Sequence, residues 1–296
     1  RRTYHQNIAS AFERESNGGA EIPPELIAQH FSAAENATSA IPWWLQAGRR
    51  ALERSANVEA VDHLQRGIVL TEDLPDGAAR RELQVELQLT LGNAQTKTGQ
   101  LREALQAYNQ AARLARLIDS AIDFARAALG FEEVEFYQGL TEEGSILLLE
   151  EALTRLGQDE TVERCRTLGV LGRAYGTVGK MDRAMALTDS AVVMAQRIGD
   201  KRALYDALFM GYYATVVGQV EGSLPIAQEL HRLAHELGDW DLIMRAESWL
   251  TFHYLQASAR DKYEVALAAY RELAENHHIQ IHLWVTTSAF TMDAIL

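Results

Sequence analysis

The stretch from Cys165 to Asp200 constrains the fold of this chain more than any other part of it. Apolar and small residues recur there at helical spacing until Gly179 interrupts the pattern, and a second amphipathic run begins at Met181. The small residues that would allow the two backbones to approach closely are Gly172, Ala184 and Ala191. The stretch therefore predicts two amphipathic helices joined by a tight turn.

The same spacing recurs along the chain. Counted from Gly172, a turn residue follows at position 7 and small residues follow at positions 12 and 19. The pattern repeats from Gly48 and Gly92, and more weakly from Gly211. The 80 residues between Gly92 and Gly172 must hold one more, degenerate repeat. The predicted turns lie at Ser55, Gly99, Gly139, Gly179 and Gly218, with a last turn near Arg260-Asp261.

Junctions between successive repeats carry a second signal. We expect one helix to end and the next to begin at Ile118-Asp119, Gly199-Asp200 and Gly238-Asp239. Glycine would supply the left-handed residue after the first helix, and the aspartate carboxylate would cap the following one. The junctions are separated by 81 and 39 residues, which agrees with a repeat of about 40 residues.

This pattern of small and turn residues resembles the tetratricopeptide repeat (TPR). The resemblance implies an all-α, right-handed α-solenoid of TPR-like helical hairpins. We expect about five to six repeats over residues 37–296, and the sequence shows no strand signal of any length.

A narrower resemblance concerns residues 1–36, where a predicted helix over 3–15 precedes a short motif. The motif residues are Pro24, Glu25, Leu26, Ala28, His30 and Phe31. They resemble the junction after the ATPase core of bacterial STAND-type signalling ATPases, and most of all that of multidomain nucleotide cyclases. Large ATP-dependent transcription activators carry similar arrays. The resemblance implies a regulatory array and places no active site in this chain.

Composition limits the partners and the compartment. The chain of 296 residues has a formal net charge of −13, which disfavours binding to nucleic acid or to an anionic membrane surface. No apolar run approaches the roughly 18 residues of a membrane span. The single cysteine, Cys165, fits a reducing cytoplasm, and its apolar helical surroundings predict a buried, unreactive thiol. The chain starts without methionine and stops within a helical pattern, so we expect it to be part of a longer protein.

The sequence predicts no cofactor, no metal and no catalytic residue. The segment 174–181 approaches a phosphate-binding loop, but Met181 stands where a Mg²⁺-binding hydroxyl is needed and no strand precedes it. Two histidine pairs, His231/His235 and His278/His282, have the spacing of one helical turn. Neither pair has the glutamate of the H-E-x-x-H motif, so we expect solvated histidines on helix surfaces.

The inner face of the array is the remaining candidate for binding. First helices of successive repeats would line it with residues adjacent to the small anchors. The predicted set is Asn93, Lys97, Arg126, Glu133, Phe136, Tyr137, Arg173, Tyr212 and Thr215. This mixture of aromatic, cationic and polar groups suits a protein or peptide partner or a small anionic ligand.

The C-terminal stretch supports an alternative. Repeat arrays need a polar terminal cap, and residues 282–296 are apolar. The residues predicted to self-associate there are Leu283, Trp284, Phe290 and Leu296. The leading hypothesis is a non-catalytic regulatory, sensor and protein-interaction array of a larger cytoplasmic signalling ATPase or nucleotide cyclase. The alternatives are a homodimerisation module or the inducer-sensing array of an ATP-dependent transcription activator.

Overall fold

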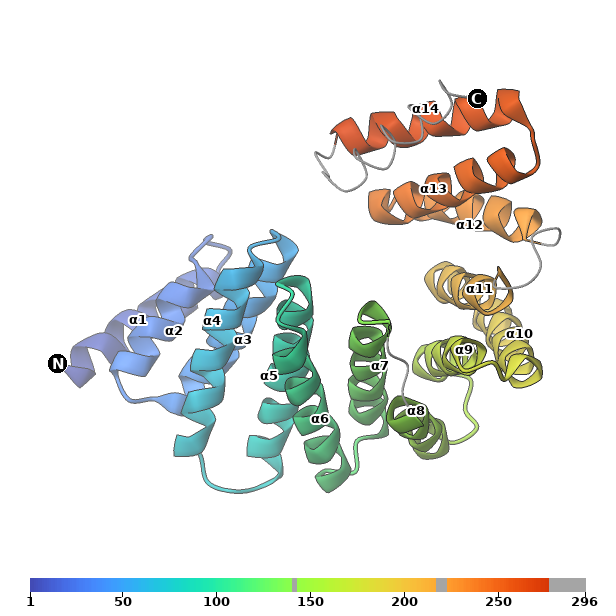
Figure 1. Ribbon diagram of the computed structural model, residues 1–296. Coiled ribbons are helices and arrows are strands. Elements are labelled where there is room, and N and C mark those ends of the chain that lie inside the picture. Colours follow the sequence, from blue (N-terminus) through green and yellow to red (C-terminus); the bar gives the residue numbers. More distant parts are fainter. Residues whose placement is uncertain (140–142, 217–222, 277–296) are drawn as a thin grey trace. The chain divides into compact units, whose positions relative to one another are not determined.

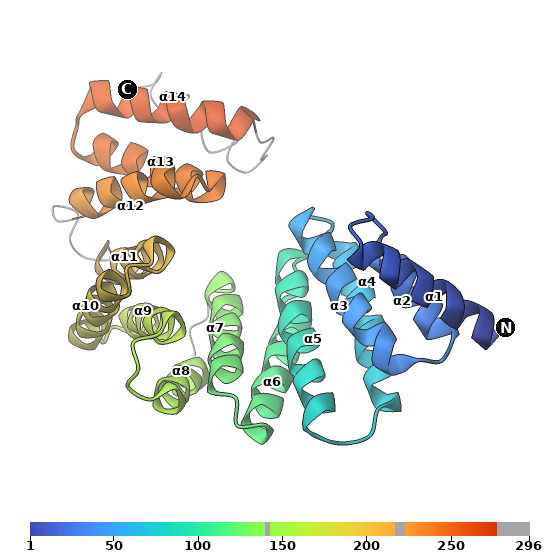
Figure 2. The ribbon, with the colours of Figure 1, turned by 180° about the vertical axis from the view of Figure 1, so that it is seen from behind.

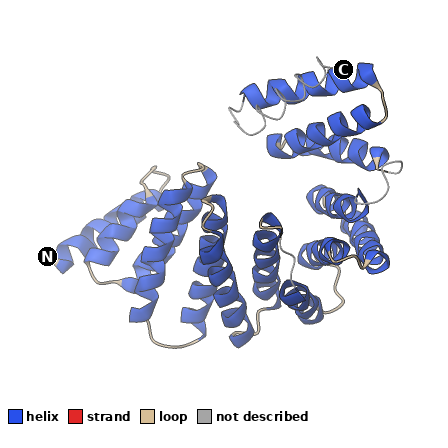
Figure 3. Ribbon diagram, viewed as in Figure 1, coloured by secondary structure: helices blue, strands red, loops and turns tan. Residues whose placement is uncertain are grey.

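The computed structural model of the chain describes residues 1–139, 143–216 and 223–276, with side chains omitted for 213–216. These residues form fourteen α-helices and one short 3-10 helix, and no strand occurs among them (Figures 1 and 3). Consecutive helices pack as hairpins, which confirms the predicted all-α, TPR-like fold. The chain forms two compact units, Arg1–Gln158 and Asp159–Leu296.

The first unit contains four pairs of helices. They are α1 (Arg2–Asn17), α2 (Pro24–Ala33), α3 (Ala37–Glu53), α4 (Asn57–Leu70), α5 (Ala78–Lys97), α6 (Leu101–Leu117), α7 (Ala121–Tyr137) and α8 (Glu143–Leu156), with η1 (Thr71–Asp73) after α4. Helix α5 contacts both α3 and α7, and the three lie in a row within this unit (Figures 1 and 2).

The second unit continues the same arrangement. Its helices are α9 (Val162–Thr177), α10 (Met181–Ile198), α11 (Lys201–Val216), α12 (Leu224–Leu237), α13 (Trp240–Gln256) and α14 (Arg260–Asn276). Each helix packs against its successor, and α9 also contacts α11. No described helix in either unit is both long and apolar enough to span a membrane.

Residues with a left-handed backbone make the turns within the hairpins. The φ values are +59° at Ser55, +76° at Gly99, +69° at Gly139 and +77° at Gly179, as the turn predictions require. The last prediction was two residues too late: Ser258, with φ +53°, makes that turn, and α14 already begins at Arg260. The turn predicted at Gly218 lies outside the described residues.

Two of the three junctions have the predicted chemistry. Gly238 is left-handed, and the Asp239 carboxylate accepts hydrogen bonds from the backbone N–H groups of Asp241 and Leu242. Gly199 is left-handed as well, with Asp200 accepting from the N–H of Ala203. The third junction is shifted by one residue.

At that junction Asp119 itself adopts φ +55°, and Ser120 provides the cap by accepting from the backbone N–H of Asp123. Asp119 replaces glycine there because a short polar side chain tolerates the left-handed region better than most others do.

The glycine anchors lie where two helices touch. A Cβ atom added to Gly172 would lie 2.6 Å from Thr188 Cγ2 and 3.0 Å from the backbone oxygen of Ala184. Gly48 and Gly92 meet Leu64 and Tyr108 in the same way. In all three hairpins the contact partner stands sixteen residues after the glycine. Glycine is therefore required by the close approach of the helices.

The N-terminal helices pack continuously onto the first repeat. Ile27 and Phe31 of α2 form one apolar cluster with Ala40 and Trp44 of α3. This cluster crosses the predicted boundary between residues 36 and 37. A separate junction domain over 1–36 thus stays a prediction.

We predict that Gly172→Ala lowers the free energy of unfolding by about 1–3 kcal/mol, because the new methyl group has backbone on one side and Thr188 on the other. Urea denaturation followed by circular dichroism measures the change. The matched control is Gly169→Ala in the same helix, where the Cβ would make an ordinary contact at 3.4 Å with Met210. Stability there should be unchanged or raised. Equal losses in both variants would contradict a steric origin.

We predict that Cys165 reacts slowly in the folded protein. Its side chain is buried and donates to the backbone oxygen of Ala191 at 3.3 Å, and burial raises the pKa of the thiol to about 11. At pH 8 roughly one molecule in a thousand then carries the reactive thiolate. A thiol-exchange reagent with a chromophore should label Cys165 fully only in urea. Rapid stoichiometric labelling without denaturant would contradict the expected burial.

Candidate functional site

Ion pairs connect the first helices of successive hairpins in the first unit. Arg49 of α3 contacts Glu86 of α5, and Arg126 of α7 donates from Nη1 to Glu86 Oε1 at 2.8 Å. Arg126 also contacts Asp123 at 3.0 Å. Glu86 is thus held between two guanidinium groups from the neighbouring repeats.

The predicted Arg126 lies in this network, whereas its neighbours Arg49, Glu86 and Asp123 were not among the predicted site residues. A usable signal exists in the sequence. Glu86 stands thirty-seven residues after Arg49 and forty residues before Arg126, which are separations of about one repeat. Opposite charges one repeat apart on first helices therefore indicate contacts between repeats.

Two parallel rows of side chains extend from this network. On α5, Asn93 and Lys97 follow Glu86 by seven and eleven residues, and both are exposed. On α7, Glu133 and Tyr137 follow Arg126 by the same intervals, and both are exposed. Such intervals place residues on one face of a helix. We call Arg49, Glu86, Asn93, Lys97, Arg126, Glu133 and Tyr137 together the polar row.

Tyr108 of α6 lies beneath the polar row. A Cβ atom added to Gly92 would lie 2.8 Å from the nearest atom of the Tyr108 ring, and a Cβ atom added to Gly130 would lie 2.3 Å from it. Burial, and then the nearby Glu133 carboxylate, raise the pKa of Tyr108. One aromatic ring therefore packs against α5 and α7 below their polar side chains.

Two other predicted residues also lie at this end of α7. The Tyr137 hydroxyl is 3.3 Å from Glu133 Oε1, and Tyr137 is 57% exposed. Phe136 is half-buried, with its ring centroid 6.4 Å from that of Tyr137. Of the predicted residues, Asn93 and Lys97 thus lie on α5, and Arg126, Glu133, Phe136 and Tyr137 lie on α7, which packs against it.

The predicted placement of Arg173 and Tyr212 on an open surface is corrected. Arg173 is 4% exposed on α9, a helix that packs against both α10 and α11. Tyr212 is fully buried, with its hydroxyl 2.6 Å from His253 Nε2 and its ring 4.5 Å from that of Trp249. Both positions adjoin an anchor glycine, but neighbouring helices cover them.

The structure does not describe the side chains of the remaining predicted residues. The side chain of Thr215 is among those not described. The same holds for the self-association residues Leu283, Trp284, Phe290 and Leu296 and for the pair His278/His282.

The second unit has its own ion pairs between first helices. Arg166 of α9 contacts Asp206 of α11 at 3.3 Å, and Arg202 of α11 contacts Asp239, the cap of α13, at 3.1 Å. The separations in sequence are again forty and thirty-seven residues. Charge pairing between repeats is therefore common to both units.

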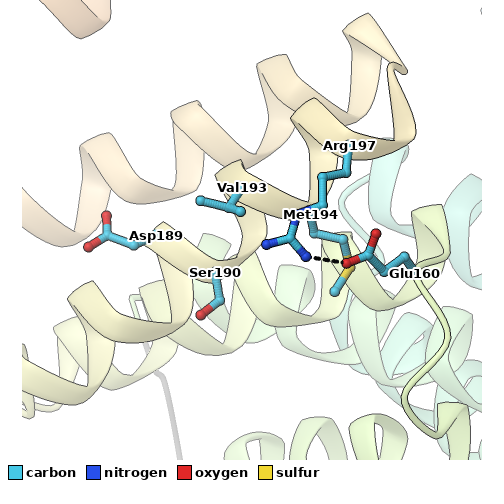
Figure 4. A pocket seen from close by; sticks show the side chains of 6 residues that line it. All are labelled: Glu160, Asp189, Ser190, Val193, Met194 and Arg197. Carbon is cyan, nitrogen blue, oxygen red and sulfur yellow. Dashed lines mark hydrogen bonds and ion pairs between the residues drawn. The ribbon is translucent and has the colours of Figure 1, made fainter.

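Two shallow pockets are lined by other residues. One, of about 360 Å³, is formed by α10 and the segment before α9, where Arg197 pairs with Glu160 at 2.6 Å beside Asp189, Ser190, Val193 and Met194 (Figure 4). The other, of about 430 Å³, includes Trp44 with the Arg66 guanidinium 5.3 Å from its ring centroid. In both pockets the arginine is already engaged by the protein.

Comparison with known proteins shows the fold alone. No protein-family model and no curated protein matches the chain. Among solved structures, the chain is similar to a Rap protein complexed with competence and sporulation factor, with a TM-score of 0.68 and 16% sequence identity. The match covers 96% of this chain and 78% of the Rap protein.

Two further similarities involve regulatory proteins. The Rap conjugation gene regulator of plasmid pLS20, in complex with the Phr* peptide, has TM-score 0.57 and 15% identity over 84% of this chain and 66% of its own. A STAND protein with a tetratricopeptide repeat sensor from Pyrococcus horikoshii has TM-score 0.61 and 16% identity over 89% of this chain. The match spans 42% of the STAND protein.

Fold and surface together define the class of the protein as a TPR-like helical repeat array. Its structural neighbours include Rap regulators and the sensor-bearing STAND protein.

We predict that Tyr212 stabilises the second unit. Tyr212→Phe leaves buried His253 Nε2 without the tyrosine hydroxyl, which should lower the free energy of unfolding by about 1–2 kcal/mol in urea denaturation. Burial lowers the pKa of His253 below its ordinary value of 6.5. The unfolded chain therefore binds the proton more readily, and His253 should reduce stability as the pH falls below 6.5.

The control is His253→Gln, in which the loss of stability between about pH 7.5 and about pH 5.5 should be smaller than in the wild type. An unchanged stability of Tyr212→Phe together with an identical pH dependence of His253→Gln would contradict this structural role.

Proposed function

We propose that this chain is a non-catalytic regulatory and protein-interaction array of a larger signalling ATPase or nucleotide cyclase, and that it captures a peptide segment on the polar row. The proposal is supported by the packing of α5 against α7: exposed Asn93 and Lys97 follow Glu86 at the same intervals at which exposed Glu133 and Tyr137 follow Arg126. Amide, ammonium, carboxylate and phenol groups provide both donors and acceptors for an extended peptide backbone.

The chemistry of the polar row supports a peptide better than a compact small molecule. Arg126 is occupied by Glu86 and Asp123, so one part of the row is rigid and internally neutralised. Lys97 and Glu133 carry opposite charges on adjacent helices and suit a partner with complementary charges along its length. The net charge of −13 favours a basic partner at longer range.

Structural neighbours add support for a regulatory role. Two of the similar Rap structures are complexes, one with competence and sporulation factor and one with the Phr* peptide. The similarity to the sensor-bearing STAND protein agrees with the resemblance of residues 24–31 to the junction after an ATPase core. These similarities favour a signal-receiving array attached to an ATPase or cyclase output.

We predict that the chain selects peptides from a random displayed library and binds them through the polar row. Fluorescence anisotropy with the selected synthetic peptides should show a loss of affinity of about 10-fold or more in Lys97→Glu or Glu133→Lys, because each removes a charge-assisted contact. Arg113→Glu is the matched control, since Arg113 is an exposed cation on the second helix α6.

Peptides that bind both row variants as tightly as the wild type would contradict the proposed surface, and so would a failure to recover any. Hydrolysis of ATP or cyclisation of a nucleotide by the purified chain would contradict the non-catalytic role.

A further inference from the structure

Three potential metal ligands meet where α12 packs against α13. His231 and His235 stand one turn apart on α12, and their Nε2 atoms are 3.1 Å apart. Glu247 of α13 brings its Oε1 to 2.8 Å from His231 Nε2 and 3.9 Å from His235 Nε2. One nitrogen or oxygen atom from each side chain therefore faces a common point.

The spacing of these three atoms fits coordination of a small transition metal ion. In a tetrahedral zinc site, ligands bound at about 2.0–2.2 Å lie about 3.4 Å from one another. The separations of 2.8, 3.1 and 3.9 Å lie on both sides of this value. Two imidazoles with one carboxylate suit zinc-like ions, whereas Ca²⁺ and Mg²⁺ require mainly oxygen ligands.

Electrostatics points in the same direction. The Glu247 side chain is 8% exposed, and a buried carboxylate is costly unless a cation compensates it. In the part of the chain that the structure describes, no lysine or arginine forms an ion pair with Glu247; its partners are His231 and His235. A divalent ion would compensate the carboxylate and use the lone pairs of both imidazoles.

We propose that His231, His235 and Glu247 bind a divalent transition metal ion of the zinc class. The His235 side chain is 52% exposed, so the cluster opens to solvent and leaves a fourth coordination position for water or an added ligand. The ion would fasten α12, the second helix of one hairpin, to α13, the first helix of the next (Figure 1). The sequence predicted no metal here because Glu247 comes from another helix.

The experiment uses the full chain after removal of metal with a chelator. Titration with Zn²⁺ alone should show one tight equivalent by calorimetry, and Co²⁺ alone should give the visible absorption of a four- or five-coordinate site. Zn²⁺ should also raise the thermal unfolding midpoint, because it binds the folded state.

Substitution of each ligand tests the assignment. His235→Gln and Glu247→Gln should each weaken Zn²⁺ binding by at least ~10-fold. Glutamine at 247 keeps an oxygen acceptor for His231, so this variant should stay folded without metal. His235→Cys at an exposed position should retain binding and add a thiolate-to-cobalt charge-transfer band.

Two controls separate this site from other histidines. The His5 and His30 rings also approach closely, with their Nδ1 atoms 2.9 Å apart. Among the described residues they belong to no three-ligand cluster, so His5→Gln should bind Zn²⁺ like the wild type. The double variant His278→Gln/His282→Gln should bind normally too. The proposal is overturned if this double variant loses the tight equivalent, or if Glu247→Gln binds Zn²⁺ as the wild type does.

Discussion

Three of the hairpins depend on one contact, in which a first-helix glycine meets the side chain sixteen residues further along. Tyr108 fills the place opposite Gly92, and Thr188 fills the place opposite Gly172. The same side chain also touches the first helix of the next hairpin: a Cβ on Gly130 would lie 2.3 Å from the Tyr108 ring. Thr188 likewise lies 3.4 Å from the position of a Cβ atom on Gly211, so Tyr108 and Thr188 each set the spacing of three helices.

The polar row follows from that spacing. With Tyr108 between α5 and α7, the two helices are close enough for Arg126 to reach Glu86. These partly exposed ion pairs contribute at most about 1 kcal/mol each to folding. The side chains of the polar row therefore contribute little to the stability of the fold, because the buried core beneath them keeps the helices packed. Substitutions among these side chains should therefore change the free energy of unfolding little.

Local chemistry explains what the sequence predicted well. The turns at Gly99 and Gly179 need a left-handed residue, and the cap at Asp239 needs a carboxylate, so each is visible in a few neighbouring residues. Burial of individual positions was less accessible. Asn93 and Arg173 both follow an anchor glycine, but Asn93 is exposed and Arg173 is buried. The difference depends on packing against other helices, which periodicity within one helix does not encode.

The cluster of His231, His235 and Glu247 differs from the ion pairs by a feature of the repeat itself. Asp206 pairs with Arg166, forty residues earlier, and Asp239 pairs with Arg202, thirty-seven residues earlier. Each arginine lies on the preceding first helix. The corresponding positions before Glu247 are Ala207 and Met210, so the repeat supplies no guanidinium there. The imidazoles of α12 occupy that role instead. A buried carboxylate without the guanidinium partner of its own array needs another compensating charge, and the proposed divalent ion, held by Glu247 and both imidazoles, would supply it.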